Sequence, residues 1–233
     1  MSARQQPSVG VVMPLHNGAR YVAEAIASAM EAGGTALKRI VVVDDGSDDD
    51  GLSIAVGCGG DIVEGVRIEH AGVSAARNRG IAMLDTDLIA FLDHDDLWPK
   101  DGLVSRVAFL EAHPEADGVY GRVEQFVCPT VSEERRRQLR FESFDKPSPT
   151  ITALVLRRES FLKVGLFRPE VGNAENLEWY LRARAVGLDL MPLDRIVLRR
   201  RIHGANSTVR NRDLGLEYVR VLRSHLQSRR GSP

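Results

Sequence analysis

The chain has 233 residues, of which 43% are apolar, 27% charged and only 6% aromatic. This length is enough to close one ordinary globular core and not two, so it predicts a single domain. The 31 basic and 32 acidic residues give a formal net charge of −1, which favours neither nucleic acid nor an anionic membrane as a partner of the whole molecule. No apolar run reaches about eighteen residues, the length that suggests a transmembrane segment, and no signal peptide is recognisable, so we expect a soluble, cytoplasmic protein.

Short apolar runs that end in polar turns alternate with stretches of helical spacing in the first half of the chain. The runs have the continuous apolar character of strands buried on both faces of a parallel sheet. They cover residues 8–13, 39–43, 62–68 and 88–92, and the helical stretches cover 21–30 and 73–84. This alternation predicts an α/β fold with an open, mainly parallel sheet, whose ligand site lies at the carboxyl ends of the strands.

The second half of the chain continues with weaker patterns. Further helices are predicted over 99–113, 175–186 and 213–228, and further strands over 118–127, 151–156 and 194–202. The charged and turn-rich part of residues 128–150 is expected to form an exposed, mobile excursion. We therefore expect one domain over 1–212, followed by a C-terminal helix and tail over 213–233.

The C-terminal part of the chain is strongly basic. Residues 195–233 contain ten arginines and two acidic residues, a local balance of +8. The default interpretation is a solvated helix face, and the alternative is a surface that binds phosphate or makes peripheral contact with a membrane. The two cysteines, Cys58 and Cys128, lack metal-site spacing and are expected to be free thiols.

A cluster of acids follows the predicted strand at 88–92. Asp93 and Asp95 project to the same side because strand side chains alternate, so two carboxylates face one point. Such a pair repels unless a basic side chain or a divalent cation neutralises it. Bound Mg²⁺ or Mn²⁺ keeps open coordination positions that a diphosphate can fill, and the alternative is an ordinary acidic turn.

Other polar turns are expected at the same edge of the sheet. Pro14 and Asn17 follow the first predicted strand, and Asp44 and Asp45 end the second. Arg77 stands at the expected start of a helix, where its planar fork of donors suits a phosphate or a base carbonyl. The glycine patterns of P-loop enzymes and of dinucleotide-binding dehydrogenases are both absent, so these acids and this arginine favour a diphosphate held through a cation.

Together these segments resemble the family 2 glycosyltransferases of the GT-A fold. The similarity runs through VVMPLHNGARYVAEAIASAM, IVVVDDGSDDD, GVSAARNRGIAMLDTDLIAFLDHDDLWPKDGL and AENLEWYLRARAVG, within residues 8–205. It implies a nucleotide-diphospho-sugar transferase fold, with an open, mixed and mainly parallel sheet flanked by helices. It also implies an inverting enzyme that uses a nucleotide-diphosphate sugar and a divalent cation, Mn²⁺ or Mg²⁺.

The resemblance implies a nucleotide site built from the first polar turns. Pro14 and Asn17 would line the nucleotide pocket, Asp44 or Asp45 would contact the base, and Arg77 would touch the nucleotide.

The resemblance likewise implies a metal site around the acidic cluster. Asp93 and Asp95 would form the DxD element that binds the ribose and the metal–diphosphate. His203, which follows the last predicted strand, is a candidate metal ligand, with a structural role as the alternative. Trp98, beside the acids, is interpreted as a residue that stacks on the sugar.

The sequence departs from the family at the position of the general base. Where the family usually has Glu-Asp, this chain has Glu175 and Asn176, and an amide has no useful proton affinity near neutral pH. Glu175 is therefore the first candidate base and Glu178, on a nearby face of the same helix, the second. For Glu178 the alternative is a favourable interaction with the helix dipole.

The predicted reaction is metal-dependent, inverting transfer of a sugar, with UDP as the expected nucleotide. The acceptor is a hydroxyl group on a saccharide, a lipid-linked molecule or another compound, and no nucleic acid partner is expected. Two alternatives stay open: a catalytically impaired domain that binds nucleotide sugars, and a Mg²⁺-dependent nucleotidyl or phosphoryl transferase that uses the same acids.

Overall fold

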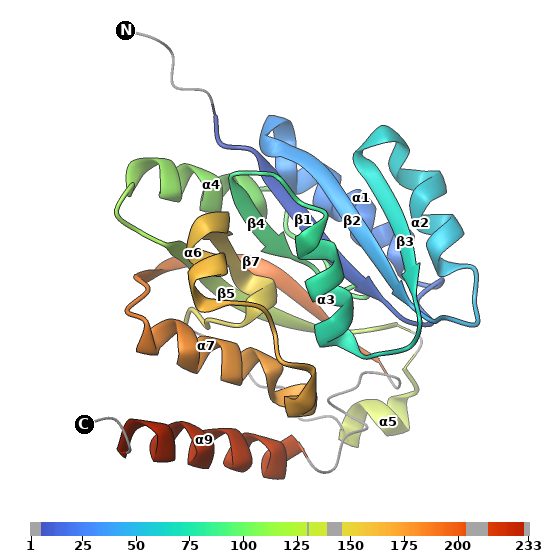
Figure 1. The fold of residues 1–233 in the computed structure, drawn as a ribbon. Coiled ribbons are helices and arrows are strands. Elements are labelled where there is room, and N and C mark those ends of the chain that lie inside the picture. The colour runs from blue at the N-terminus through green and yellow to red at the C-terminus, as the bar shows by residue number, and fades with distance from the viewer. Residues whose placement is uncertain (1–5, 130, 139–145, 204–213, 231–233) are drawn as a thin grey trace, which may run out of the picture.

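A computed structural model of the protein describes residues 6–129, 131–138, 146–203 and 214–230. Its centre is a seven-stranded sheet with the strand order β3-β2-β1-β4-β6-β5-β7 (Figure 1). The strands are β1 (Val9–Leu15), β2 (Leu37–Asp45), β3 (Val63–Ile68), β4 (Leu88–Phe91), β5 (Gly118–Val127), β6 (Leu154–Arg157) and β7 (Leu190–Ile202).

The sheet is mixed and mainly parallel. Strands β3, β2, β1 and β4 run parallel to one another, β6 is antiparallel to both of its neighbours, and β7 is parallel to β5. Every residue of β1 and β4 is buried, as expected of central strands covered on both faces. The predicted fold class is therefore confirmed.

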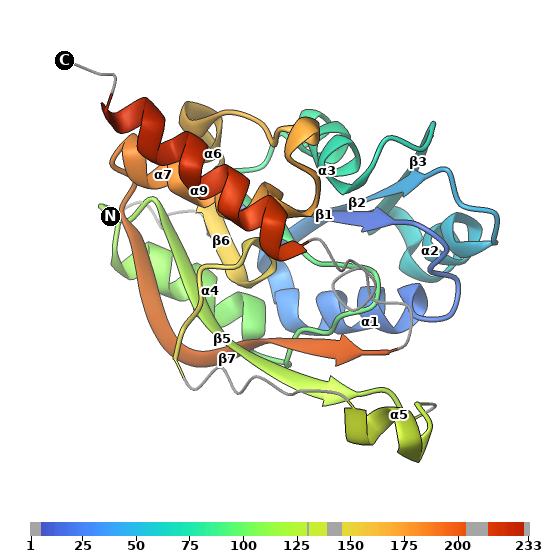
Figure 2. The ribbon, with the colours of Figure 1, turned by 90° about the horizontal axis from the view of Figure 1, so that it is seen from below.

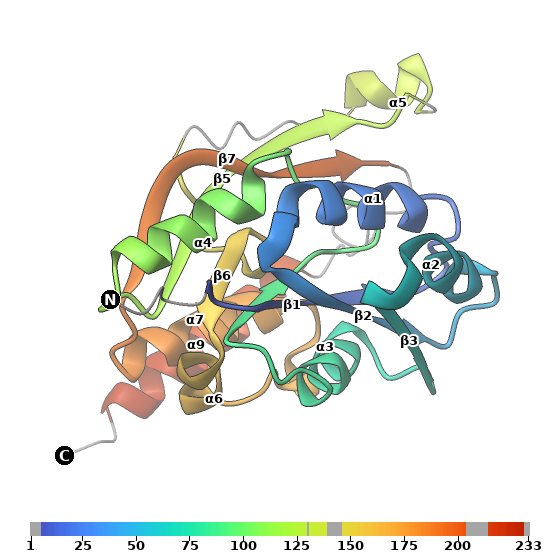
Figure 3. The same cartoon turned by 90° about the horizontal axis from the view of Figure 1, so that it is seen from above.

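Helices cover both faces of the sheet. They are α1 (Val22–Gly33), α2 (Gly51–Gly59), α3 (Val73–Ala82), α4 (Gly102–Ala112), α5 (Glu133–Gln138), α6 (Arg158–Val164), α7 (Glu175–Ala185) and α9 (Leu214–Arg230). Residues of α1, α2 and α4 share a core with one face of the sheet, as Figure 3 shows from above, and residues of α3, α6 and α7 share a core with the other face. Helix α9 forms an outer layer against α7, seen most clearly from below in Figure 2.

Most predicted elements are present, with several corrections. Helix α2 was not predicted, and the first half of the strand expected over 151–156 is a short 3₁₀ helix, Ile151–Ala153, that precedes β6. Strand β7 begins at Leu190 and is four residues longer than predicted, because its first part pairs with β5 from Gly118 onward. A short helix, α5, occupies part of the expected excursion. Arg77 lies in the middle of α3 and not at its start, since the helix begins at Val73.

The predicted terminal helix is confirmed as α9, with bounds one or two residues later than expected. The boundary proposed at residue 212 falls outside the described residues, so the division of the chain at that point stays a prediction. Among the helices that the structure describes, none combines the length and the apolar character needed to cross a membrane.

Candidate active site

The loops that follow the parallel strands meet at one edge of the sheet. The backbone N–H of Asn17, after β1, donates to Ser47 Oγ at 2.9 Å, and Asn17 Oδ1 accepts from the N–H of Asp48 at 2.8 Å. Asn17 has a φ of 50°, a left-handed conformation that asparagine adopts more readily than most residues. His94 Nδ1, after β4, lies 3.2 Å from the carbonyl oxygen of Pro14. The expected convergence of these polar turns is thus observed.

The two aspartates that end β2 both stabilise neighbouring loops. Asp44 is fully buried, and its Oδ1 accepts from the backbone N–H and the hydroxyl of Ser47. Its Oδ2 lies 3.4 Å from the guanidinium of Arg67, with no hydrogen bond among the described residues. The carboxylate of Asp45 accepts from the N–H groups of residues 71 and 72 at 2.7 and 2.9 Å. Asp44 Oδ2 is thus the carboxylate oxygen of these two aspartates that has no hydrogen bond in the described part of the chain, and contact of either aspartate with the base stays a prediction.

Sequence reasoning missed two histidines beside Asp45. The Nδ1 atoms of His16 and His70 each lie 2.9 Å from the Asp45 carbonyl oxygen, and the two rings pack with centroids 4.6 Å apart. Hydrogen bonding to this carbonyl and the charge of the Asp45 carboxylate raise the pKa of His70. The possible metal-ligand atoms of the three residues lie within 4.8 Å of one another. The signal in the sequence is that both histidines follow a predicted strand closely.

Arg77 connects the acidic cluster to the start of α7. It is 2% exposed, and its guanidinium donates to Asp93 Oδ1 at 3.0 Å and to Glu175 Oε1 at 2.7 Å. Burial lowers the pKa of Arg77, but the two carboxylates outweigh it and hold the pKa above the usual value. Arg77 thus forms a buried bridge between two other predicted site residues, and its contact with the nucleotide stays a prediction.

Asp95 and His203, both predicted metal ligands, are brought together. His203 Nε2 lies 2.8 Å from Asp95 Oδ2, and both side chains are largely buried. Burial raises the pKa of Asp95, but the hydrogen bond and charge of His203 and the charge of His94 outweigh it, so the pKa is lowered. Burial and the charges of Asp95 and Asp93 raise the pKa of Asp96 well above its usual value.

Strand β7 fixes the position of this acidic turn through Arg201. The backbone N–H of Arg201 donates to Asp96 Oδ1 and its Nε donates to the carbonyl of Asp95, both at 2.9 Å. Its guanidinium also pairs with Glu24 of α1 at 2.6 Å. Because His203 is two residues further along, the same strand end holds the histidine against Asp95. Arg201 was not singled out from the sequence, where it stands in a run of three arginines.

The two candidate bases on α7 differ in their surroundings. Both oxygens of Glu178 accept from Arg182, at 2.8 and 2.9 Å, and Arg168 lies 3.2 Å away. Glu175 is 4% exposed and uses only Oε1, so its buried Oε2 has no hydrogen-bond partner among the described residues. The buried Oδ1 of Asn176 is likewise unpartnered. Glu175 and Asn176 thus each have one buried acceptor atom without a hydrogen-bond partner among the described residues, whereas both oxygens of Glu178 are paired.

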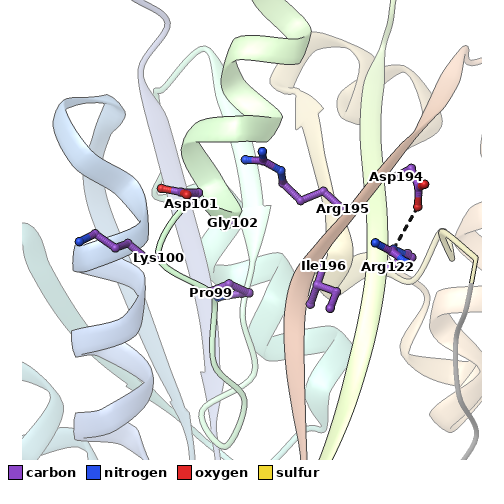
Figure 4. Close-up of a pocket in the computed structure, with 8 residues that line it drawn as sticks. All are labelled: Pro99, Lys100, Asp101, Gly102, Arg122, Asp194, Arg195 and Ile196. Atoms are coloured by element: carbon purple, nitrogen blue, oxygen red, sulfur yellow. Dashed lines mark ion pairs between the residues drawn. The ribbon is translucent and has the colours of Figure 1, made fainter.

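A separate pocket lies between the start of α4 and strands β5 and β7. It has a volume of about 460 Å³ and is lined by residues 99–102, Arg122 and residues 194–196 (Figure 4). An ion pair of 3.0 Å joins Arg122 to Asp194 inside this pocket, which contains none of the predicted site residues.

Trp98, expected to stack on a sugar, is instead 3% exposed and packs beneath the guanidinium of Arg106 at 4.8 Å. The expectation that Trp98 stacks on a sugar was wrong, because its indole ring is part of the buried core.

The residues present fit a divalent cation beside Asp95. Its carboxylate and the His203 nitrogen are separated by 2.8 Å, close to the ~3 Å between adjacent ligands of an octahedral ion with bonds of about 2.1 Å. Burial raises the pKa of Asp96 most, and a cation would offset the smaller contribution that comes from the charges of Asp95 and Asp93. Asp93 differs, because its Oδ1 already pairs with Arg77. Asp95 and His203 are therefore better candidates for metal ligands than the full predicted set, which also includes Asp93.

Several curated proteins are similar to this chain in sequence. An uncharacterized glycosyltransferase of Rickettsia typhi is 28% identical over 217 residues, which cover 87% of this chain and 66% of the relative. The succinoglycan biosynthesis protein ExoU of Rhizobium meliloti is 34% identical over 145 residues, which cover 56% of this chain and 41% of the relative. A third relative, an uncharacterized glycosyltransferase of Rickettsia felis, is covered over 34% of its length. The chain thus spans about one third to two thirds of these relatives.

Solved structures share the fold. The crystal structure of S. aureus TarS 1-349 in complex with UDP-GlcNAc matches with a TM-score of 0.75 at 18% identity, over 94% of this chain and 65% of that one. The same TarS fragment in complex with UDP matches with a TM-score of 0.71. The family model for glycosyl transferase family 2 matches residues 10–165, which contain the polar turns after β1, β2 and β4 and the helix that carries Arg77. This chain belongs to glycosyl transferase family 2.

Proposed function

We propose that the protein transfers a sugar from a UDP-sugar to a hydroxyl acceptor, with inversion at the anomeric carbon and with a divalent cation. Family membership supports the class of reaction, and the structural likeness to a TarS crystal structure that contains UDP-GlcNAc supports the uridine nucleotide. The polar loops after β1, β2 and β4 would bind the nucleotide, with Asn17 and Asp44 at the base and ribose end.

The observation that carries the proposal is the environment of Glu175. Arg77 holds one of its carboxylate oxygens and leaves the other buried without a hydrogen-bond partner among the described residues. A buried acceptor atom without a partner is costly unless a ligand satisfies it. An acceptor hydroxyl that donates to Oε2 would meet this need and would be placed for loss of its proton.

In the proposed reaction, Glu175 Oε2 takes the proton of the acceptor hydroxyl as that oxygen bonds to the anomeric carbon. The bond from this carbon to the diphosphate oxygen breaks on the opposite face, so the configuration inverts and UDP leaves. Arg77 keeps Glu175 in place and also fixes Asp93 on the donor side, at 3.0 Å. One buried side chain would thereby set the distance between the donor and acceptor halves of the site.

Asp95 and His203 would hold the cation, and Asp93, paired to Arg77, would meet the ribose. When bound, such a cation stabilises the negative charge that develops on the departing diphosphate. Arg201 would keep both ligands in position through its contacts with residues 95 and 96.

The direct test is the variant Glu175→Gln, assayed for sugar transfer and for UDP binding. We expect transfer to fall by about 10²–10⁴-fold, the usual contribution of a general base, while UDP binding changes little. Glu178→Gln is the matched control, because both oxygens of Glu178 are occupied by Arg182. If Glu178→Gln abolishes transfer and Glu175→Gln does not, the base is misassigned.

A second candidate function is a domain that binds nucleotide sugars without transferring them. Asn176 favours it, because this position usually carries the catalytic aspartate in the family that the sequence resembles. Slow release of UDP from a UDP-sugar in the presence of Mn²⁺ distinguishes the two, since only the enzyme releases it. Release of pyrophosphate or phosphate would instead identify a nucleotidyl or phosphoryl transferase.

A further inference from the structure

Helix α9 presents apolar side chains to solvent on the side that faces away from the body. Leu216, Val219, Leu222 and Leu226 recur every three or four residues and therefore lie along one side of the helix. They are 57%, 43%, 42% and 56% exposed. The described part of the chain has twelve exposed large apolar residues, and five of them lie between Leu216 and Leu226. A solvated surface helix would turn polar side chains outward instead.

The opposite side of α9 attaches the helix to the body. Val221 is 9% exposed and Glu217 Oε2 accepts from the backbone N–H of Asn173 at 3.0 Å. The inner side of α9 packs against α7 and the 3₁₀ helix η4 (Pro169–Ala174) through residues other than those of the outer apolar stripe. This packing therefore does not account for the stripe.

The charge of the outer side has one sign. Arg220 and Arg223 are exposed and stand beside the apolar stripe. The acidic residue of α9, Glu217, points inward to Asn173. An apolar stripe flanked by arginines and free of carboxylates is complementary to an anionic bilayer, whose headgroups attract the cations while its acyl chains take up the leucines.

We propose that the outer face of α9, formed by Leu216, Val219, Arg220, Leu222, Arg223 and Leu226, docks the protein onto an anionic lipid bilayer. The helix would lie in the plane of the interface, with its apolar stripe among the upper acyl chains. For the C-terminal arginines, this proposal adopts the membrane-contact alternative in place of the default of a solvated face.

The position of α9 extends the proposed function, on which this step rests. The first turns of α9 lie against the start of α7, where Glu217 contacts Asn173, two residues before Glu175. A bilayer bound to the outer face of α9 would therefore be separated from the acceptor side of the site by this one helix, and the acceptor class that fits is a hydroxyl group on a membrane-borne lipid.

The test is co-sedimentation of the full chain with vesicles, without any sugar donor. We expect binding to phosphatidylcholine vesicles that contain about one third phosphatidylglycerol and little binding to pure phosphatidylcholine. The double variant Leu222→Glu/Leu226→Glu should lower the partition coefficient at least about tenfold, because it removes the apolar stripe. Arg220→Gln/Arg223→Gln should lower it about twentyfold, near fivefold for each arginine, and added salt should mimic this loss.

Matched controls come from the opposite face of the sheet. Met30 on α1 and Val56 on α2 are 41% and 44% exposed, and Met30→Glu and Val56→Glu should bind vesicles as the unchanged protein does. The α9 variants should keep the melting temperature, since the altered residues are exposed. Equal binding by all variants would overturn the proposal. The proposal would also be overturned if the protein did not bind vesicles and instead formed a dimer that Leu222→Glu/Leu226→Glu dissociates. That result would assign the stripe to contact with a second copy of the chain. The vesicle assay contains no sugar donor, so its result does not depend on whether the protein catalyses the proposed sugar transfer.

Discussion

Arg77 is the residue on which the geometry of the candidate site depends most. It is almost fully buried and satisfies one oxygen of Asp93 and one of Glu175, which stand 82 positions apart in the sequence. Removing the Arg77 guanidinium would leave the buried carboxylate of Glu175 and the partly exposed carboxylate of Asp93 without their shared partner, and an unpaired buried charge is costly.

Arg77→Met is therefore expected to lower the free energy of unfolding by about 3–5 kcal/mol, the usual cost of breaking a buried ion pair from one side. Arg79→Met, two residues along the same helix, is the matched control because Arg79 is exposed, and it should change stability by less than about 0.5 kcal/mol. Urea denaturation followed by circular dichroism measures both. Equal effects of the two substitutions would show that the bridge contributes nothing.

His70 gives a prediction that depends on pH. Its raised pKa means that the folded state binds the proton more tightly than the unfolded chain does. The contact with Asp45 therefore stabilises the fold fully below the ordinary histidine pKa, and this contribution is lost as the pH rises through the higher folded value. An NMR titration of the imidazole protons should give a pKa for His70 above that of a peptide histidine. A value at or below the peptide value contradicts the hydrogen bond to Asp45.

Asn176→Asp tests whether position 176 or position 175 supplies the base. Since Glu175 is proposed to take the proton, restoring the aspartate should change turnover by less than about tenfold, within the modest range of a neighbouring charge. Steady-state assays of sugar transfer measure this effect. A gain of several orders of magnitude would mean that the natural chain lacks its base, and it would favour the nucleotide-sugar-binding alternative.

Among the elements, α3 is tied to the sheet by a close approach at Gly80. A Cβ atom built at this residue would lie 2.4 Å from Cγ1 of Val12, a buried branched side chain of β1 that has nowhere to move. The approach matters for the site because α3 carries Arg77 one turn earlier.

Gly80→Ala is expected to destabilise the protein by about 1–3 kcal/mol, the usual cost of overpacking a core. Gly57→Ala, in α2, should instead stabilise it by about 0.5–1 kcal/mol, because alanine is the better helix former and a Cβ there meets no atom within 4 Å. Thermal unfolding of the two variants should shift in opposite directions. A shift of both in the same direction would contradict the packing of α3 on β1.

The elements also show what the sequence can predict. The first four strands could be located because a parallel strand buried on both faces leaves a continuous apolar run, as in β1 and β2. Of the helices between them, α1 and α3 were predicted, whereas α2 was not. The insertion of β6 between β4 and β5 could not, since strand order depends on contacts that no local pattern records. The pairing of Glu178 with Arg182 was readable from their spacing of four residues, which favours an ion pair on a helix.

At the scale of the whole molecule, the convergence of the polar turns could be predicted because parallel strands end at one edge of a sheet. The partners of the site residues could not, because they come from distant parts of the fold. The bridge from Arg77 to Glu175 and the contact between Arg201 and Asp96 join segments about one hundred residues apart, 98 and 105 positions respectively. The sequence thus supplied the candidate residues, while the packing of α3, α7 and β7 decided which of them meet.

The account as a whole is tested most directly by a crystal soaked with UDP and Mn²⁺ and measured at the manganese absorption edge. We predict one anomalous peak within bonding distance, about 2.0–2.3 Å, of Asp95 and His203, with the diphosphate completing the coordination and Arg77 still joined to Glu175. A peak among His16, Asp45 and His70 instead, or none beside Asp95, would contradict the proposed site.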